Sequence, residues 1–197
     1  MGVKEFMEDL LGRLKYAVEQ LKGDKVTVRY LADMHGESAH GALLLFLAVL
    51  TMLPIPFSGM LFSFGIFALA WMMLRGKTEH GLPDIVCRVE IPPAAAAKMI
   101  KTLSWIYKMA GKFSRPRLVR LTNAAHNAWL APFVFAMGFI IFLPIPGGNG
   151  APAAALILVG LGMMAKDGLA ILAGLLTGFV AVGMIVFLGW AAVQVLI

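Results

Sequence analysis

The tetrapeptide Leu53-Pro54-Ile55-Pro56 decides the fold, because the same four residues return as Leu143-Pro144-Ile145-Pro146 and each copy interrupts a long apolar run. A proline removes a backbone hydrogen-bond donor and clashes with the preceding turn, so two prolines one residue apart end a helix. Uncharged residues flank both copies, at 41–52 and 57–74 around the first and at 127–142 and 147–165 around the second. The sequence therefore predicts an internal repeat: two units of helix, break and helix, offset by 90 residues.

The composition of the chain indicates the solvent in which it folds. Hydrophobic residues make up 60% of the 197 residues, charged residues only 14%, and the mean hydropathy is +0.84. A water-soluble protein of this size cannot bury so much apolar surface, whereas a bilayer solvates it. The backbone inside a bilayer must satisfy its own hydrogen bonds, and long apolar runs do so as helices. The predicted fold class is an all-α polytopic helical membrane protein.

The four apolar arms around the breaks are short. Counted with Leu53, the first arm runs over 41–53, and the other three are the uncharged stretches given above. As helices the four arms extend about 20 to 28 Å, less than a hydrocarbon core of roughly 30 Å. The hairpins are expected either to barely cross the membrane or to be re-entrant, and the sequence leaves both arrangements open.

The positions of the 17 lysines and arginines predict the orientation. Six precede the first unit, ten lie between the units, and Lys166 follows the second unit. Basic residues stay on the cytoplasmic side of a membrane, so the N-terminus is expected in the cytoplasm. If both hairpins start there they form a parallel repeat, whereas an inverted repeat would require the basic segment between them to cross, which its charges oppose. The uncharged run 168–197 predicts a long transmembrane helix. In it, Gly174 and Gly178 have the GxxxG spacing of close helix contacts, either within the chain or in a homodimer.

Five segments follow from these patterns. They are amphipathic cytoplasmic helices at 1–36, the first membrane hairpin at 37–75, a basic amphipathic interfacial segment at 76–126, the second hairpin at 127–167 and the C-terminal helix at 168–197.

The amphipathic segments are expected to contact membrane lipids. The first segment is expected to contain helices over 4–22 and 27–35. In the third, a helix that begins after Pro92 and Pro93 has an apolar face for the interface and keeps its lysines at the headgroups. These lysines are Lys98, Lys101, Lys108 and Lys112. No nucleic-acid partner is expected, because the periodic apolar face and the flanking membrane segments favour a lipid surface.

Side chains with catalytic or metal-binding chemistry are scarce. The apolar runs contain no carboxylate, lysine or arginine of the kind that relays protons. The four histidines lie outside these runs without zinc-site spacing, and the single cysteine, Cys87, forms no disulfide framework. We expect neither an enzyme nor a cofactor nor a metal site.

The breaks themselves remain as the candidate site. The carbonyls ahead of each proline lose their helical partners, and the helices that follow present free N–H groups at a positive dipole end. Such groups are suited to an anionic group, for example a lipid phosphate. The alternative is that both breaks are only tight turns, capped by Ser58 and Asn149. The candidate ligand-binding residues are Pro54, Pro56, Ser58, Gly59, Pro144, Pro146, Gly148 and Asn149.

The order of these motifs resembles that of the ExoD-type exopolysaccharide synthesis proteins of bacterial inner membranes. The resemblance runs from about Thr27 to Leu188 and implies a role in exopolysaccharide production, without supplying catalytic residues. It is carried by His40-Gly41-Ala42-Leu43-Leu44-Leu45, both Leu-Pro-Ile-Pro copies, Leu82-Pro83, Pro92, Arg115-Pro116-Arg117-Leu118 and Lys166-Asp167-Gly168.

Two functions of different classes are consistent with these patterns. The first is a non-enzymatic accessory or transport-like role in exopolysaccharide synthesis or export, on a lipid-linked or anionic saccharide intermediate held at the breaks. The second is a membrane scaffold or regulator that binds a polysaccharide synthase through its cytoplasmic amphipathic helices. A homodimer is expected in either case.

Overall fold

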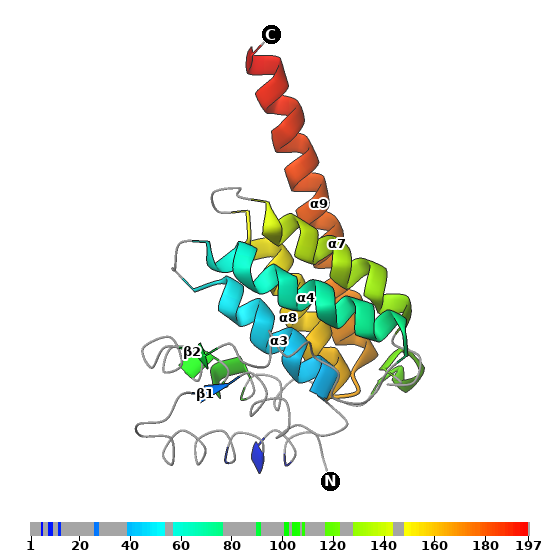
Figure 1. Cartoon of the computed structure of the whole chain (residues 1–197). Coiled ribbons are helices and arrows are strands. Elements are labelled where there is room, and N and C mark those ends of the chain that lie inside the picture. Colours follow the sequence, from blue (N-terminus) through cyan, green and yellow to red (C-terminus); the bar gives the residue numbers. More distant parts are fainter. Residues whose placement is uncertain are drawn as a thin grey trace.

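The computed structural model shows a bundle of helices from which the last helix projects (Figure 1). It describes residues 39–53, 57–76, 117–122, 128–143 and 148–196, and short pieces at 5, 8–9, 12, 26–27, 90–91, 101–102, 104–106 and 108. The elements are α3 (Ala39–Thr51), α4 (Ser58–Leu74), the 3-10 turn η2 (Val119–Thr122), α7 (Ala131–Phe142), α8 (Gly150–Met164) and α9 (Gly168–Leu196). A two-residue antiparallel pair joins β1 (Val26–Thr27) to β2 (Glu90–Ile91).

Helices lie on both sides of each predicted break, α3 and α4 around the first and α7 and α8 around the second. The four prolines of the breaks lie outside the described residues. The second arm of the second unit is shorter than predicted, because α8 begins at Gly150 and Gly148 and Asn149 form a turn before it. Pro132 occupies the first turn of α7, where its missing N–H leaves no helical bond unmade.

The prediction of a helix over residues 27–35 is wrong at its first residue. Thr27 pairs with Glu90 in the strand pair, and Val26 pairs with Ile91. β-Branched side chains such as those of Val26, Thr27 and Ile91 favour extended backbone when a partner strand is present. A pairing between segments far apart in the sequence therefore overrides the local pattern here.

Helix length separates α9 from the rest of the bundle. Within the described part of the chain, α9 is the one helix that is long and apolar enough to cross a membrane, over Gly168–Phe187. The helices α3, α4, α7 and α8 are also apolar but have only 13, 17, 12 and 15 residues. The all-helical class is thus confirmed, whereas several membrane crossings are not supported by helix length.

Each hairpin packs mainly on the other hairpin. α3 lies chiefly against α8, and α4 lies chiefly against α7. A Cβ atom added to Gly41, at the start of α3, would lie 2.8 Å from the carbonyl oxygen of Gly160, near the end of α8. One added to Gly138, near the end of α7, would lie 2.8 Å from Cγ2 of Ile66 in α4. Both pairs of helices are antiparallel, so both breaks lie at the same end of the bundle (Figure 1).

Positions related by the repeat offset have equivalent places in the bundle. Seven of the nine buried residues of α4 have a buried counterpart in α8. Both helices also end alike, because Gly76 and Lys166, which follow them at this offset, have left-handed backbones with φ of 61° and 52°. The two units therefore share their pattern of buried residues and the way their second helices end, in addition to the repeated tetrapeptide.

The helix α3 is the centre of the core, and its residues from Ala42 to Thr51 are all buried. A helix that is apolar on every side is stable only when it is covered all round. Its counterpart α7 instead exposes Phe135 and Phe139. Ile106, from the predicted interfacial segment, is buried and belongs to the same core, whereas the neighbouring Trp105 and Lys108 are exposed.

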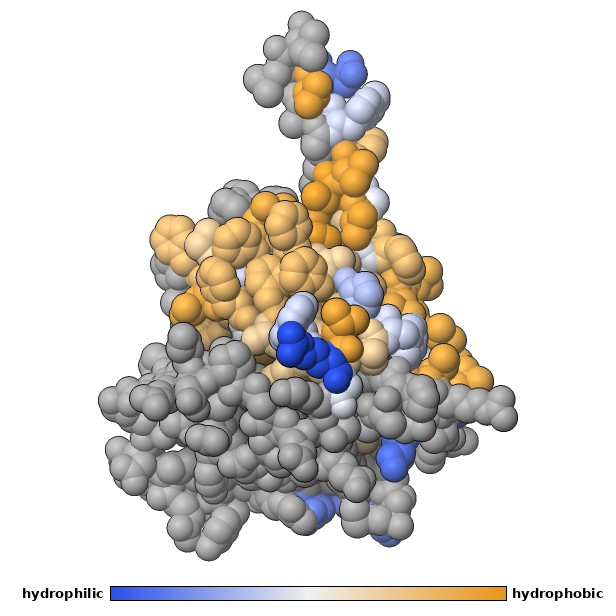
Figure 2. Space-filling model, turned by 45° about the vertical axis from the view of Figure 1, so that its right-hand side comes forward, coloured by the Kyte–Doolittle hydropathy of each residue, from blue (hydrophilic) through white to orange (hydrophobic). Residues whose placement is uncertain are grey.

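The outside of the bundle is apolar. Large hydrophobic side chains are exposed along α4, α7 and α9, and Figure 2 shows that they cover one side of the bundle and continue onto the projecting part of α9. Water-soluble monomers rarely expose apolar patches of this extent. These side chains are Leu61, Phe64, Trp71, Leu74, Phe135, Phe139, Leu169, Leu172, Leu176, Phe179, Val180, Met184, Val186, Phe187, Trp190 and Val193.

Candidate functional site

The structure brings the two breaks into contact. Gly59, in the first turn of α4, lies directly against the side chain of Asn149, the residue before α8. A Cβ atom added to Gly59 would overlap Nδ2 of Asn149 and would lie 3.1 Å from the carbonyl oxygen of Ile141. Gly59 is therefore required by close approach. We call Ser58, Gly59 and Asn149 the joint.

Ser58 satisfies a backbone group that the first break leaves open. Its Oγ donates a hydrogen bond of 3.1 Å to the carbonyl oxygen of Leu53, the residue ahead of Pro54. The residue before α4 is Phe57, and no side chain caps the N-terminus of this helix. Ser58 thus caps the turn at the freed carbonyl and not the N-terminus of α4, which fits the alternative of a tight turn at this break.

Asn149 lies at the N-cap of α8 but its side chain makes no capping hydrogen bond. Its backbone is helical, with φ of −76° and ψ of −21°, whereas a capping Asn has extended backbone. Among the described residues its Oδ1 atom is buried and has no hydrogen-bond partner. Buried polar atoms are nearly always paired, so Asn149 is the unusual group of the joint. The candidate residue Gly148 is partly buried beside it.

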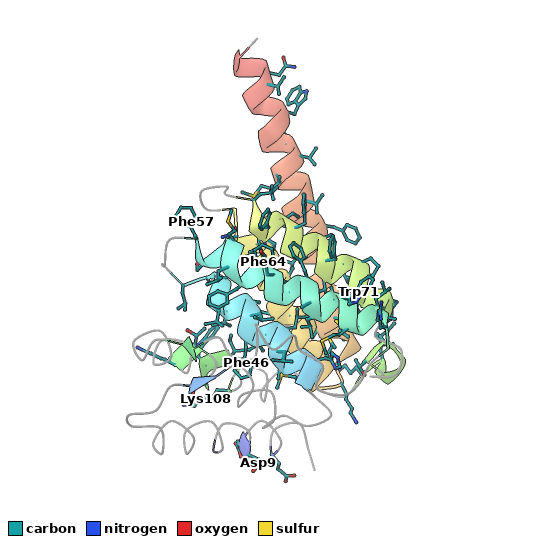
Figure 3. All side chains as sticks on the ribbon, viewed as in Figure 1. Asp9, Phe46, Phe57, Phe64, Trp71 and Lys108 are labelled. Carbon is teal, nitrogen blue, oxygen red and sulfur yellow. The ribbon has the colours of Figure 1, made fainter. Side chains whose placement is uncertain are left out.

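Phe57 is a residue of this region that the sequence reasoning missed. It has a left-handed backbone with φ of 61°, and its side chain is 75% exposed. A bulky residue in this conformation is strained. At the repeat offset its counterpart is Gly147, so comparison of the two units signals a position that needs positive φ. Figure 3 shows Phe57 at the end of α4 opposite to Trp71.

The other polar side chains of the predicted apolar runs bond to their own helices. Thr51, Ser63 and Thr177 donate hydrogen bonds of 2.7 to 2.8 Å to the carbonyl oxygens of Ala48, Met60 and Ala173. Gln194 is exposed near the end of α9. Among the described residues, no group of three or more metal-ligating side chains lies together. Asn149 is therefore distinguished from the other polar residues named for these runs.

The glycines of the GxxxG spacing pack within the chain. A Cβ atom on Gly174 would lie 2.8 Å from the carbonyl oxygen of Ala155, and one on Gly178 would lie 3.1 Å from Sδ of Met137. Of the two uses left open for this spacing, the intrachain contact is the one observed. The homodimer stays a prediction.

The joint offers backbone donors and one amide, without a charged side chain of its own. The helices α4 and α8 both begin there, so two positive dipole ends face the same region. Four residues of the candidate site lie outside the described part of the chain: Pro54, Pro56, Pro144 and Pro146. This arrangement is suited to holding a polar or anionic group, and among its described residues no base lies beside the hydroxyl of Ser58, which bonds to the carbonyl of Leu53.

The fold and the site define a class: an apolar helical bundle with one candidate membrane-spanning helix and a joint between two broken hairpins. The family model described as "Exopolysaccharide synthesis, ExoD" matches residues 8–187, and the chain belongs to this family. This membership confirms the resemblance and implies involvement in exopolysaccharide synthesis.

Two relatives match most of the chain. The "Uncharacterized protein slr1875" of Synechocystis sp. is 27% identical over 165 residues, which cover 82% of this chain and 77% of the relative. "Protein ExoD" of Rhizobium meliloti is 26% identical over 164 residues, which cover 80% of this chain and 68% of the relative. No solved structure matches the chain.

Proposed function

We propose that this protein is a membrane component of exopolysaccharide synthesis or export that holds a lipid-linked or anionic intermediate at the joint, without catalysing a reaction. The observation that carries the proposal is the contact between Gly59 and Asn149, which unites the breaks of two hairpins. Family membership supports the pathway, and the exposed apolar surface together with α9 supports a membrane location in the bacterial inner membrane.

We further propose that the two hairpins are copies of one ancestral unit in a parallel repeat. Support comes from the shared burial pattern of α4 and α8 and from their similar left-handed ends. Two copies that each contribute one break would make a site on the axis between them, as in repeat-built transporters. An origin by duplication would thus explain why the joint lies between the two hairpins.

The buried amide of Asn149 provides the test. Asn149→Ala removes a buried oxygen, Oδ1, that has no hydrogen-bond partner among the described residues, so the variant is expected to leave folding intact. In a polymer-producing strain that lacks its own copy, Asn149→Ala is expected to abolish polymer while the protein stays at its normal level in membranes. The matched control is Ser63→Ala, because this buried hydroxyl bonds only within α4, and it is expected to keep polymer production.

The scaffold function is the second candidate, and the exposure of Lys101 and Lys108 favours it. A scaffold that binds a synthase through this surface would tolerate Asn149→Ala and would fail when Lys101→Glu and Lys108→Glu are combined. Normal polymer with Asn149→Ala and loss with the lysine pair would overturn the proposed site in favour of the scaffold.

A further inference from the structure

The hairpin helices and α9 differ in length. At about 1.5 Å per residue, α3, α4, α7 and α8 extend roughly 20, 26, 18 and 22 Å, whereas the 29 residues of α9 extend roughly 44 Å. A hydrocarbon core is about 30 Å thick. The four hairpin helices are each shorter than this core, and α9 is longer.

The contacts of α9 show how far the bundle reaches along it. Its buried positions include Ile171, Gly174, Gly178 and Ala181, and the partly buried Val182 and Ile185 still pack against the core. Beyond Ile185 the described large side chains are exposed. Figure 1 shows the remaining turns standing clear of the other helices, past the end at which both breaks lie. From Gly168 to Ile185 is about 26 Å of helix. The bundle therefore covers only part of the length of α9.

Charged and aromatic residues mark where a membrane would begin. Arg75, Arg117 and Lys166 are exposed at the end of the bundle opposite to the breaks, where the backbone N–H of Gly168 donates a 2.7 Å hydrogen bond to the carbonyl of Arg117. The guanidinium of Arg75 lies 4.7 Å above the ring of Trp71. Figure 3 shows Lys108 and Asp9 below the bundle, on the side away from the projecting part of α9. Basic residues with tryptophan are typical of a membrane interface.

The second boundary lies on the projecting part of α9. Trp190 and Gln194 are exposed there. Between Ala181 and Trp190 the described exposed residues are Gly183 and the apolar Met184, Val186 and Phe187. The distance along the helix from Gly168 to Trp190 is about 33 Å, close to the thickness of a hydrocarbon core. The aromatic and polar residues of the two ends are thus spaced as two interfaces would be.

From this spacing we infer that only α9 crosses the bilayer, and that both hairpins enter from the side of Arg75 and Lys166 and end inside it. Because the hairpin helices extend only roughly 18 to 26 Å, the breaks lie short of the far headgroups. The occupant of the exposed apolar surface, the projecting part of α9 included, is lipid acyl chain.

This inference rests on the membrane location in the proposed function and deepens it. A joint that lies inside the hydrocarbon is reached along the membrane, not from water on the far side. The ligand class is therefore narrowed from any anionic saccharide to one that is carried on a lipid.

The test compares three single cysteines in full-length protein in which Cys87 is replaced by serine. Phe57→Cys reports the breaks and is preferable to Ser58, because Phe57 is 75% exposed and Ser58 is buried by protein in any case. Gln194→Cys reports the far end of α9, and Lys166→Cys reports the base. Each is treated with a membrane-impermeant maleimide in spheroplasts, in opened membranes and in detergent.

We expect Gln194→Cys to be labelled from outside, Lys166→Cys only in opened membranes, and Phe57→Cys only in detergent. Labelling of Phe57→Cys in spheroplasts at the rate of Gln194→Cys would show fully crossing hairpins and overturn the inference. Continued protection of Phe57→Cys in detergent would show that a second copy, not lipid, covers the breaks, which also overturns it. If the protein is absent from the membrane fraction, the proposed function itself fails, which is a distinguishable outcome.

Discussion

Two residues with the same place in the two units, Gly76 and Lys166, show how a single backbone angle ends a helix. Each follows its helix in the left-handed conformation, and in the second unit the N–H of Asp167 then bonds back to the carbonyl of Gly162 at 2.8 Å. This is the usual glycine-type helix end. Glycine adopts the conformation without steric conflict, whereas lysine does not. At this helix end the second unit therefore carries strain that the first unit lacks.

The replacement Lys166→Gly is predicted to stabilise the protein, by up to about 1 kcal/mol, because it removes this strain. Gly76→Ala is predicted to destabilise it by about 1 kcal/mol or more, for the opposite reason. Thermal unfolding followed by circular dichroism of the detergent-solubilised protein would measure both changes. The control is Gly183→Ala, because a Cβ atom added there would meet no described atom outside its own stretch of helix within 4 Å. A lower melting temperature for Lys166→Gly would contradict the prediction.

At the scale of the element, α9 has two parts with different surroundings. Its first part packs on α8 and α7 through Gly174 and Gly178, and its second part has large exposed apolar side chains such as Phe187. A close helix contact of this kind depends on the absence of a side chain. The GxxxG spacing therefore fixes α9 to its own chain, and any homodimer has to use another surface unless α9 moves.

The replacement Gly174→Val is predicted to destabilise the bundle by about 1–3 kcal/mol, the usual range for overpacking. The added Cβ atom would lie 2.8 Å from the carbonyl of Ala155 and 2.7 Å from Cγ2 of Val159, and backbone atoms there cannot move aside. Gly183→Val is the matched control in the same helix, because it carries the same propensity cost without the contact. Melting temperatures in detergent compare the two variants. Equal values would show that α9 does not dock on α8 as described.

At the scale of the whole molecule, the hairpins depend on each other. The most extensive contacts of α3 and α4 are with α8 and α7, so each hairpin leaves its main partner in the other half of the sequence. The fully buried α3 would lose its α8 covering in a half molecule, and burial of apolar side chains is the main stabilising contribution to a core. The two hairpins are therefore expected to fold as one cooperative unit, although each has the same order of helix, break and helix.

A chain divided between residues 126 and 127 tests this dependence. The fragments 1–126 and 127–197 are predicted to accumulate and copurify when they are produced together, and to be degraded when each is produced alone. Copurification from membranes, followed by limited proteolysis, provides the measurement. A stable, protease-resistant 1–126 fragment on its own would show that the first hairpin needs no partner.

Local chemistry explains the part of the fold that the sequence predicts. Paired prolines end helices whatever surrounds them, so the arms around Leu53 and Leu143 were predictable. An uncharged run such as 168–197 forms a helix because the polar backbone groups in apolar surroundings must hydrogen-bond to each other. The family resemblance was also carried by order and spacing along the chain. These features depend on neighbours in sequence.

The joint was predicted only in part. The sequence places Ser58 and Asn149 next to the breaks. It does not show that Gly59 contacts Asn149, or that the side chains of Ser58 and Asn149 leave the N-termini of α4 and α8 uncapped. The strained Phe57 could have been found from its alignment with Gly147. The pairing of Thr27 with Glu90 could not, because no local signal specifies a partner strand so far along the chain.

The apolar class of the protein, the two broken helical units and the long last helix thus follow from local sequence, since periodicity and proline act over a few residues. Folding in three dimensions selects which helices meet: α3 with α8, α4 with α7, the GxxxG glycines with their own chain, and the two breaks with each other. These contacts depend on complementary shapes of side chains far apart in the sequence, as at Gly41 with Gly160, and close packing selects one arrangement among many apolar ones.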